Sequence, residues 1–295
     1  MIGLPVRTER LVHVYHTEGH DVAALSGVDI DVRGGELVGL LGPSGAGKST
    51  LLSLLGGMIR PSAGRILLGD AELSALSERE LDELRATRIS IMLQGAARNL
   101  VPYRDPEQNV AFAQRWSRSP DLPSPQEVLA SVGLGDQAHV PLTELTAGQL
   151  QLVAVAVALA SRPGLLLADE PTSQLDHAAR DTVLQAVARA NRELGTTVLL
   201  VTHDPAVAQR LPRTITIRDG KIGGEGRLGE EYAVVTADGF LPLPAHALPT
   251  LPPGTLVRFR SAPEGFLLVI EDGSPGTSAG EGPPAGGGAP VGDDR

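Results

Sequence analysis

The sequence predicts an α/β fold built around a parallel β-sheet. Three short apolar runs, residues 37–41, 165–168 and 197–201, are typical of strands that are buried on both faces. A helical pattern spans residues 177–194, between the second and third of these runs. Because a strand, a helix and a strand follow one another, we expect the two strands to pair in parallel and the helix to pack on the sheet.

Further elements can be placed around this core in chain order. Residues 28–32 alternate apolar and acidic side chains, which predicts a half-exposed strand. A helix is expected over residues 50–55, and Gly56 and Gly57 are expected to end it. Residues from about 73 to 162 are rich in charge, proline and short helical patterns, which indicates a helical insertion between two halves of the core.

The long helix over residues 177–194 has signals at both ends. Asp176 is a favourable N-cap, and Gly195 is a favourable stop. The most apolar stretch of the chain, residues 150–168, is interrupted by Gln151 and by the breaker cluster 161–164. It therefore predicts a buried helix followed by a buried strand, and not a membrane span. No signal peptide is expected either, because charged residues follow Val6 without an apolar region.

The C-terminal part differs from the core in composition. Residues 232–270 contain three β-like runs separated by prolines, at 232–236, 255–259 and 266–270, and predict a small β appendage. From residue 271 the chain is almost only Gly, Pro, Ala, Ser and acidic residues, which predicts disorder because such a segment buries little apolar surface. The expected division is a main domain over 1–226, an appendage over 227–270 and a tail over 271–295.

Composition limits the partners of the chain. A net charge of −10 and an aromatic content of 3% argue against nucleic acid or an anionic membrane surface as a direct partner. The 295 residues include no cysteine, which excludes disulfides and thiol chemistry and fits a reducing compartment.

A glycine-rich run directly after the first apolar strand matches the spacing G-x-x-x-x-G-K-[ST]. Glycines let successive backbone N–H groups turn toward one oxyanion. Lys48 places a compact positive charge at the β- and γ-phosphates of a nucleotide, and the Ser49 hydroxyl can ligate Mg²⁺. The following helix directs its positive end at the same phosphates. The predicted phosphate-binding residues are Gly42, Pro43, Ser44, Gly45, Ala46, Gly47, Lys48, Ser49 and Thr50.

Lysine usage supports this interpretation. Of the 25 Lys and Arg residues, only Lys48 and Lys221 are lysines. A chain that uses arginine almost everywhere keeps an ammonium group at the position where a compact charge is needed.

Polar side chains follow the other two predicted parallel strands. Asp169 and Glu170 come after residues 165–168, and His203 comes after residues 197–201. Ligands bind at the carboxyl ends of the strands in such sheets. Two adjacent carboxylates at the end of a buried strand are also costly unless a cation lies beside them. The sequence therefore predicts a nucleotide and Mg²⁺ site at this edge.

With these motifs in this order, residues 9–222 resemble the ATP-binding subunits of ABC transporters. Within that family the spacing is most similar to the branch that drives lipoprotein release and macrolide-type export. The resemblance implies a P-loop NTPase core with a parallel sheet, an inserted helical subdomain and an N-terminal antiparallel β portion. The small C-terminal β appendage is added to it. ATP and Mg²⁺ are the implied cofactors.

The resemblance also implies roles for the matching residues. Glu170 would act as the general base on the attacking water, and His203 would contact the γ-phosphate. Asp169, in the Walker B motif, would hold Mg²⁺ together with Ser49. Gln94, in a segment similar to the Q-loop, would contact Mg²⁺ and the water.

Three further features match the family pattern. Tyr15 is similar to the aromatic residue that stacks on adenine. Residues 173–176 resemble the D-loop, which bridges two subunits and ends at Asp176. Asn109 lies where relatives have an E-N-V element, in the region that couples the cassette to its membrane partner.

The signature motif departs from the family pattern. Where relatives have L-S-G-G-Q, this chain has Leu145, Thr146, Ala147, Gly148 and Gln149. Thr146 adds a methyl group, and Ala147 replaces a glycine that permits close backbone approach or an unusual φ. Leu152 and Val157 stand at two positions that are usually Arg. Because the signature closes over ATP held by the partner subunit, we expect weaker closure and slower hydrolysis, with ATP binding retained.

The implied function is that of an ATP-hydrolysing subunit that dimerises and powers an ABC membrane complex. Its implied partners are a second ATP-binding subunit, identical or different, and a membrane-spanning permease that selects the cargo. The implied location is cytoplasmic, at the inner face of the membrane. The alternative is a regulatory subunit with a degenerate signature that binds ATP but hydrolyses little. Soluble DNA-repair or translation ATPases are disfavoured, because those chains usually carry two cassettes or a coiled-coil insertion.

The appendage shows a faint similarity of its own. Residues 234–244 and 251–259 resemble the swapped-hairpin β fold of AbrB-type proteins, which dimerise and in many cases bind DNA. Arg258 and Arg260 are the chief basic residues of this span, against several acidic ones. A clamping or regulatory role is therefore favoured over DNA binding. The remaining interpretation is an unstructured proline-rich tail.

Overall fold

The computed structural model separates into two compact units, Met1–Pro242 and Leu243–Arg295. It describes residues 3–17, 19–117, 121–227, 230–235, 239, 241–243, 247, 249–251, 255–263 and 265–270. The predicted disordered tail, residues 271–295, lies outside the described residues. The strand over 230–232 pairs with the strand before it, within the first unit, and the predicted domain boundary at residue 226 stays a prediction.

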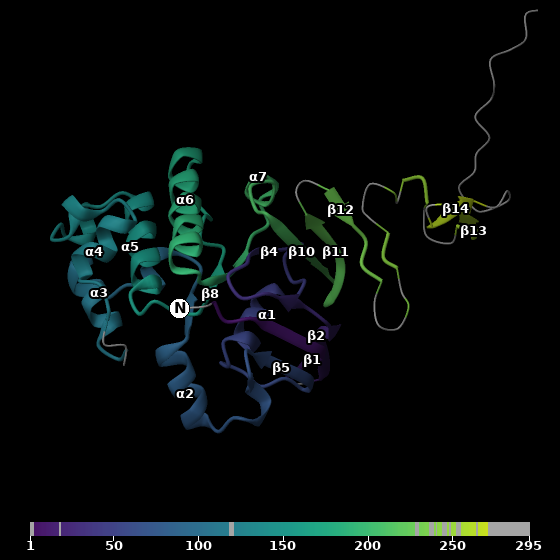
Figure 1. Ribbon diagram of the computed structural model, residues 1–295, viewed down its shortest axis with the longest axis horizontal. Coiled ribbons are helices and arrows are strands. Elements are labelled where there is room, and N and C mark those ends of the chain that lie inside the picture. The colour runs from purple at the N-terminus through teal and green to yellow at the C-terminus, as the bar shows by residue number, and fades with distance from the viewer. Residues whose placement is uncertain are drawn as a thin grey trace, which may run out of the picture. The chain divides into compact units, whose positions relative to one another are not determined.

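A seven-stranded sheet forms the centre of the first unit, in the order β12-β11-β10-β4-β9-β8-β7. Figure 1 labels β8, β4, β10, β11 and β12 of this sheet. The five strands from β10 to β7 are parallel, and β11 and β12 are added antiparallel at the β10 edge. The three predicted apolar strands are adjacent in this sheet, as expected for an α/β core. The strands are β4 (Leu37–Leu41), β7 (Ile89–Met92), β8 (Leu165–Asp169), β9 (Thr197–Val201), β10 (Arg213–Arg218), β11 (Lys221–Arg227) and β12 (Glu230–Tyr232).

The second sheet is antiparallel and confirms the expected N-terminal β portion. The predicted strand over 28–32 is wrong in its extent: β2 ends at Val28, and β3 is only Asp31–Val32. The Thr8 hydroxyl lies between the two, donating to Val28 O at 2.8 Å and accepting from Ile30 N at 3.0 Å, so a side chain replaces the strand ladder there. The strands are β1 (Val6–Thr17), β2 (His20–Val28), β3 (Asp31–Val32), β5 (Ala63–Leu68) and β6 (Ala71–Glu72).

The helices cover the two faces of the main sheet. They are α1 (Lys48–Leu55), α2 (Glu78–Thr87), α3 (Pro106–Gln114), α4 (Pro125–Ser131), α5 (Ala147–Leu159), α6 (His177–Leu194) and α7 (Pro205–Ala208). The first unit also contains the single 3₁₀ turns η1 (Leu73–Ala75), η2 (Ala96–Arg98), η3 (Gly135–Gln137) and η4 (Leu142–Glu144).

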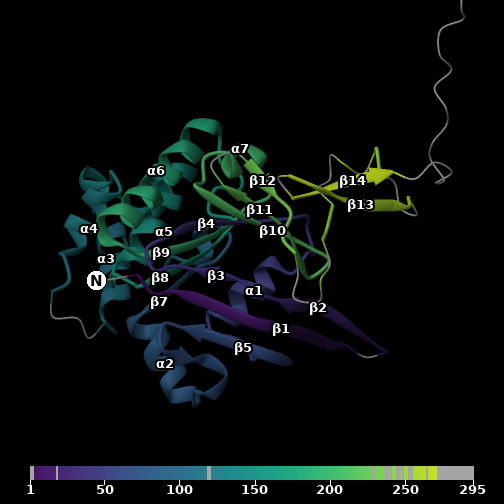
Figure 2. The same ribbon diagram turned by 45° about the vertical axis from the view of Figure 1, so that its right-hand side comes forward.

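Alternate residues of β8 enter two separate cores. Leu166 and Ala168 pack in the core that contains α5 and α6, and Leu165 and Leu167 pack in the core that contains α1 and the antiparallel sheet. Figure 2 shows α1 between the two sheets. The helix carrying the signature residues and the helix after the phosphate loop therefore lie on opposite faces of the main sheet.

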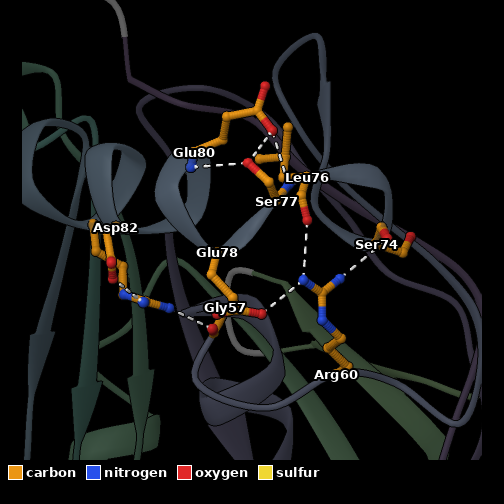
Figure 3. A network of polar contacts seen from close by, with 9 residues as sticks. Gly57, Arg60, Ser74, Leu76, Ser77, Glu78, Glu80 and Asp82 are labelled. Carbon is orange, nitrogen blue, oxygen red and sulfur yellow. Dashed lines mark hydrogen bonds and ion pairs between the residues drawn. The ribbon is translucent and has the colours of Figure 1, made fainter.

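A polar network holds α2 to the end of α1 (Figure 3). Arg60 donates to Leu76 O at 3.0 Å and pairs with Glu78 at 2.7 Å. Arg85 of α2 donates to Gly57 O at 2.5 Å. Because these contacts reach α2 from the chain that leaves α1, they fix the segment that leads into β7.

Strand β7 lies inside the range 73–162 that was predicted as a helical insertion. It pairs in parallel with β8, so this range contributes one strand to the main sheet as well as α2–α5. The range is thus not purely helical. A run of only four residues, 89–92, is too short for its pattern to separate a strand from a helix segment in sequence. The insertion as a domain remains a prediction.

The second unit contains one antiparallel hairpin among its described residues. Its strands are β13 (Val257–Ala262) and β14 (Gly265–Ile270), paired from Val257–Ile270 to Ala262–Gly265. These strands overlap the predicted runs at 255–259 and 266–270. The swapped-hairpin interpretation stays a prediction.

A half-buried ion cluster joins β10 and β11 to Glu36, the residue before β4. Arg213 pairs with Glu225 and with Glu36, each at 2.7 Å, and Arg227 adds a contact to Glu225 at 2.6 Å. Burial alone would raise the pKa of Glu225, but hydrogen bonds from Arg213 and Arg227 and their charges hold that pKa below its usual value.

This cluster predicts acid sensitivity. A carboxylate whose pKa is lowered by folding stabilises the protein above its unfolded pKa of about 4.3, and that contribution is lost as the pH falls through the lower folded pKa. Glu225→Gln is therefore expected to cost about 2 kcal/mol of unfolding free energy at neutral pH, and less as the pH falls below about 4. Urea denaturation of both proteins across this range measures the difference. An exposed control, Glu193→Gln, should show none, and a pH-independent deficit in Glu225→Gln would contradict the assignment.

Candidate functional site

The glycine-rich loop connects β4 to α1 in a conformation that only glycine permits at two positions. Gly42 and Gly47 have φ values of 145° and 97°. A Cβ on Gly42 would lie 2.1 Å from Ile217 O, and one on Gly47 would lie 2.4 Å from Ala24 O. Only glycine fits at these two positions. The loop backbone can therefore take the turn that directs its N–H groups toward a phosphate.

Lys48 lies across this loop. Its Nζ donates to Gly42 O at 2.9 Å and to Pro43 O at 2.7 Å, and only 7% of the residue is exposed. An ammonium group has three N–H donors, so one remains for a phosphate oxygen. The N-cap of α1 is Gly47, which has no side chain to cap the first turn. The free N–H groups of that turn therefore face the same place as the ammonium.

Asp169 ends β8 beside the loop. Burial raises the pKa of this carboxyl, and so does the neighbouring Glu170, while a hydrogen bond from Ser49 and the positive charges of Lys48 and Arg98 oppose the rise. A half-buried carboxylate that contacts a hydroxyl fits a divalent cation. Among the described residues there is no group of three or more His, Cys, Asp and Glu side chains that could hold a metal by themselves. This donor set suits Mg²⁺, which is usually completed by water and nucleotide phosphates.

Glu170 is held by two side chains from neighbouring strand ends. Gln94 Nε2 donates to Glu170 Oε2 at 2.9 Å, and His203 Nδ1 lies 2.8 Å from Oε1. Because a carboxylate oxygen accepts, His203 donates through Nδ1, and its Nε2 is left toward solvent. Glu170 itself has a left-handed backbone, with φ 46°, which is uncommon for a residue with a side chain. Three predicted catalytic residues thus meet at one carboxylate.

A pocket of about 350 Å³ opens at this carboxylate. Its lining comes from the Q-loop, the segment after β8 and the segment after β9, and consists of Gln94, Glu170, Thr172, Ser173, Gln174, Leu175, Arg180, Thr202, His203 and Asp204.

Tyr15 lies on β1, next to the first turn of α1. Its hydroxyl is 3.3 Å from Thr50 Oγ1, and its ring meets the His13 ring edge-on at a centroid distance of 4.7 Å. The residue is 42% exposed, so part of its ring surface is open to solvent. An aromatic face in this position can stack on a nucleotide base.

The signature residues form the start of α5. Thr146 is the N-cap: its Oγ1 accepts from Gln149 N at 3.3 Å, and Gln149 Oε1 accepts from Thr146 N at 2.9 Å. Ala147 is the first helical residue and has no left-handed φ. A Cβ on Gly148 would lie 2.8 Å from the Ala179 Cβ of α6, so this glycine allows close helix packing. Relatives have a glycine at this position either for an unusual φ or for close backbone approach. Because Ala147 has an ordinary helical φ, close approach by another molecule is the reason that still applies.

Asp176 has a local structural task. Its carboxylate accepts from Ala179 N at 2.8 Å and caps α6, as the sequence predicted. Helix α6 also ends as predicted, at Gly195 in the left-handed conformation.

Three residues at the site were missed by the sequence analysis. Asn99 fixes the Q-loop, because its side chain accepts from Leu93 N at 2.8 Å and donates to Leu93 O at 2.7 Å. Arg98 acts electrostatically on Asp169. Arg180 of α6 lines the pocket. No local pattern marks these residues, since each belongs to the site only through contacts made in the fold.

Comparison with known proteins agrees with this geometry. The family model described as ABC transporter matches residues 25–173. The lipoprotein-releasing system ATP-binding protein LolD 2 of Caulobacter vibrioides is 40% identical over 216 residues, covering 72% of this chain and 93% of that protein.

The chain belongs to the ABC transporter family.

Two other members of the ABC transporter family are similar to this chain, one over a longer stretch of sequence and one in its solved structure. The methionine import ATP-binding protein MetN 2 of Rhodococcus jostii is 34% identical over 276 residues, covering 91% of this chain and 80% of that protein. The solved dimer of the ATP-binding cassette MJ0796 bound to ADP and Pi, a post-hydrolysis state, has a TM-score of 0.68 at 31% identity. It covers 76% of this chain and 98% of that one. The chain is thus an ATP-binding subunit of the ABC transporter type.

Within the part of the chain that the structure describes, no helix has the length and apolar character needed to cross a membrane.

Proposed function

We propose that this subunit hydrolyses ATP to ADP and phosphate and thereby powers a membrane transport complex. The observation that carries the proposal is Glu170, which Gln94 and His203 hold at a strand end beside the phosphate loop. A phosphoryl-transfer site needs a fixed acceptor for the water proton and fixed positive charge at the phosphates.

The residues divide this chemistry between them. Glu170 accepts a proton from the water whose oxygen bonds to the γ-phosphorus, while the bond to the β–γ bridging oxygen breaks. Lys48 and the backbone N–H groups of the loop, among which Pro43 supplies none, bind the phosphate oxygens. His203 keeps its Nδ1–H on Glu170, so its ring donates to the γ-phosphate when Nε2 also carries a proton. Asp169, Ser49 and Gln94 would hold Mg²⁺, which supplies charge neutralisation at the phosphates when bound. Tyr15 would stack on adenine.

A second cassette is needed to complete the site. Within one chain, α5 and α1 lie on opposite faces of the main sheet, so Thr146, Ala147, Gly148 and Gln149 cannot close over the chain's own phosphate loop. The related MJ0796 cassettes were solved as dimers. We infer a dimer in which the start of α5 and the segment ending at Asp176 face the ATP of the partner, whether identical or not.

The segment after the Q-loop carries exposed apolar side chains that suit a permease partner. Tyr103, Phe112 and Trp116 are 85%, 39% and 67% exposed, and Leu93 is 37% exposed beside Gln94. Buried Asn109 holds this segment by accepting from Val101 N at 2.7 Å and donating to backbone carbonyls. Exposed large apolar groups of this kind mark interaction surfaces. We therefore place the subunit on the cytoplasmic face of the membrane, through the permease and without insertion.

The cargo is assigned to the permease. Relatives named for lipoprotein release and for methionine import match this chain at similar identity, 40% and 34%. We therefore infer that the cassette does not select the cargo.

Hydrolysis is tested by phosphate release from the purified chain with Mg²⁺-ATP and again after chelation with EDTA. We expect steady release with Mg²⁺ and none without it. Release that continues in EDTA would contradict the assignment of Asp169 and Ser49. ATP binding without any release would favour the alternative, a regulatory subunit that hydrolyses little.

The altered signature is the observation that favours this alternative. Thr146→Ser combined with Ala147→Gly is expected to raise ATP turnover by about tenfold, because it removes a methyl and a Cβ from the surface that approaches the partner's ATP. Serine keeps the N-cap of α5, so the helix start is preserved. Turnover is measured by phosphate release, with Thr143→Ser on the preceding turn as the control. Unchanged turnover in the double variant would show that the signature is not limiting.

A further inference from the structure

Arg180 lies in the first turns of α6 and contacts the segment that carries His203. Its side chain is 12% exposed, and its Nη1 pairs with Asp204 Oδ2 at 2.7 Å. Its Nη2 lies 2.7 Å from His177 Nδ1. Its buried Nε lies 3.7 Å from Asp181 Oδ1 and finds no hydrogen-bond acceptor among the described residues. One guanidinium therefore connects the start of α6 to the chain after β9.

The contact with His177 has a defined direction. A guanidinium only donates, so His177 Nδ1 accepts and its ring proton lies on Nε2. Arginine suits this place because its planar fork reaches two acceptors at fixed angles, which a lysine ammonium cannot do in the same way.

Asp204 transmits the contact to His203. Its Oδ1 accepts from Ala206 N at 2.8 Å and caps α7, and its own N–H donates to Thr202 Oγ1 at 3.1 Å. The hydrogen bond from Ala206 and the contact with Arg180 hold the pKa of Asp204 below its usual value, against the effect of burial. The two carboxylate oxygens thus have separate partners, one in α7 and one in α6. His203, the residue before Asp204, is in turn bound to Glu170.

We propose that Arg180 is a positioning residue that fixes His203 at Glu170 by holding Asp204 against the first turn of α6. The inference rests on the proposed hydrolysis and deepens it. Helix α6 starts directly after residues 173–176, the segment expected to face the second subunit. A shift of that segment would reach His203 through Arg180 and Asp204, both of which line the same pocket as Glu170.

Turnover kinetics test the proposal. Arg180→Ala is expected to lower kcat about tenfold, because the orientation of His203 is lost, while the KM for ATP changes less than about twofold. Arg192→Ala is the matched control, since Arg192 is exposed in the last turn of the same helix. Asp204→Asn should reproduce the Arg180→Ala effect, because it keeps Oδ1 for the α7 cap and changes only the oxygen that meets Arg180.

A double variant separates positioning from a general structural defect. If Arg180 acts through His203, then Arg180→Ala added to His203→Ala lowers kcat no further than His203→Ala alone. The proposal would be overturned if the fold losses in kcat of the two single variants multiplied in the double variant. A wild-type kcat in Arg180→Ala would overturn it as well.

Histidine NMR on the nucleotide-free full chain provides a readout that does not depend on turnover. The side-chain ¹H–¹⁵N signals of His203, assigned by their loss in His203→Ala, are expected to shift in Arg180→Ala and to stay in place in Arg192→Ala. An unchanged His203 signal in Arg180→Ala would also overturn the proposal. A wild-type chain that releases no phosphate would instead refute the proposed hydrolysis, while the NMR result still decides the role of Arg180.

Discussion

Glu170→Gln is expected to lower ATP turnover at least about a hundredfold while ATP binding is retained. The substitution keeps the size of the side chain and leaves one oxygen to accept from Gln94 or His203, but it removes the charge that takes the proton of the attacking water. Phosphate release measures turnover, and isothermal titration with Mg²⁺-ATP measures affinity. Because hydrolysis is blocked after binding, the ATP-bound dimer should accumulate in size-exclusion chromatography.

The comparison needs a matched control and a clear contrary result. Glu193→Gln makes the same chemical change on exposed surface of α6 and should turn over ATP like the wild type. Equal turnover in wild type and Glu170→Gln would mean that the chain binds ATP without using Glu170 as a base. The enzyme function would then be rejected in favour of the regulatory one.

Lys48→Ala is expected to weaken ATP binding by about a hundredfold, equivalent to about 3 kcal/mol. The ammonium belongs to a buried residue and is held by Gly42 O and Pro43 O, so it is fixed beside the loop before the nucleotide binds. The variant loses both the phosphate contact and the link that holds the loop closed. Titration with a non-hydrolysable ATP analogue and Mg²⁺ measures the loss.

The chain contains its own control for this prediction. Lys221, the other lysine, is exposed on β11, and Lys221→Ala should bind the analogue like the wild type. Circular dichroism and urea denaturation must show that Lys48→Ala is folded under the assay conditions. A folded Lys48→Ala with wild-type affinity would contradict the phosphate-binding role of the loop.

Much of the fold could be predicted from sequence, because its determinants are local. The strands over 37–41 and 197–201 and the helix over 177–194 have the predicted bounds in the structure. These elements are set by nearby residues: the apolar runs themselves, the N-cap Asp176 and the C-terminal stop at Gly195. The predicted strand over 28–32 was wrong in extent for the opposite reason, since the Thr8 side chain that interrupts it comes from another strand.

The candidate site divides in the same way. The phosphate loop, the carboxylates after β8 and the histidine after β9 could be found because parallel strands end at one edge, and each motif marks its own strand end. The contacts that orient these groups could not be predicted from the sequence. Asn99 bonds the backbone of Leu93 and Gly95, on either side of Gln94, only because the 3₁₀ turn η2 folds back on the Q-loop. Arg180 reaches Asp204 only because α6 packs beside the start of α7.

The sequence by itself determined the class of fold, the nucleotide loop and the family, since these follow from spacing along a single segment or from the order of segments. The tertiary structure alone decided that Gln94 and His203 meet at Glu170, that the signature helix and the phosphate loop lie on opposite sheet faces, and that Arg180 connects α6 to His203. The physical reason is the distance along the chain over which each kind of interaction acts. Capping, glycine conformation and periodicity act over a few residues, whereas a hydrogen bond between side chains 24 to 76 positions apart exists only once the sheet has set their distance.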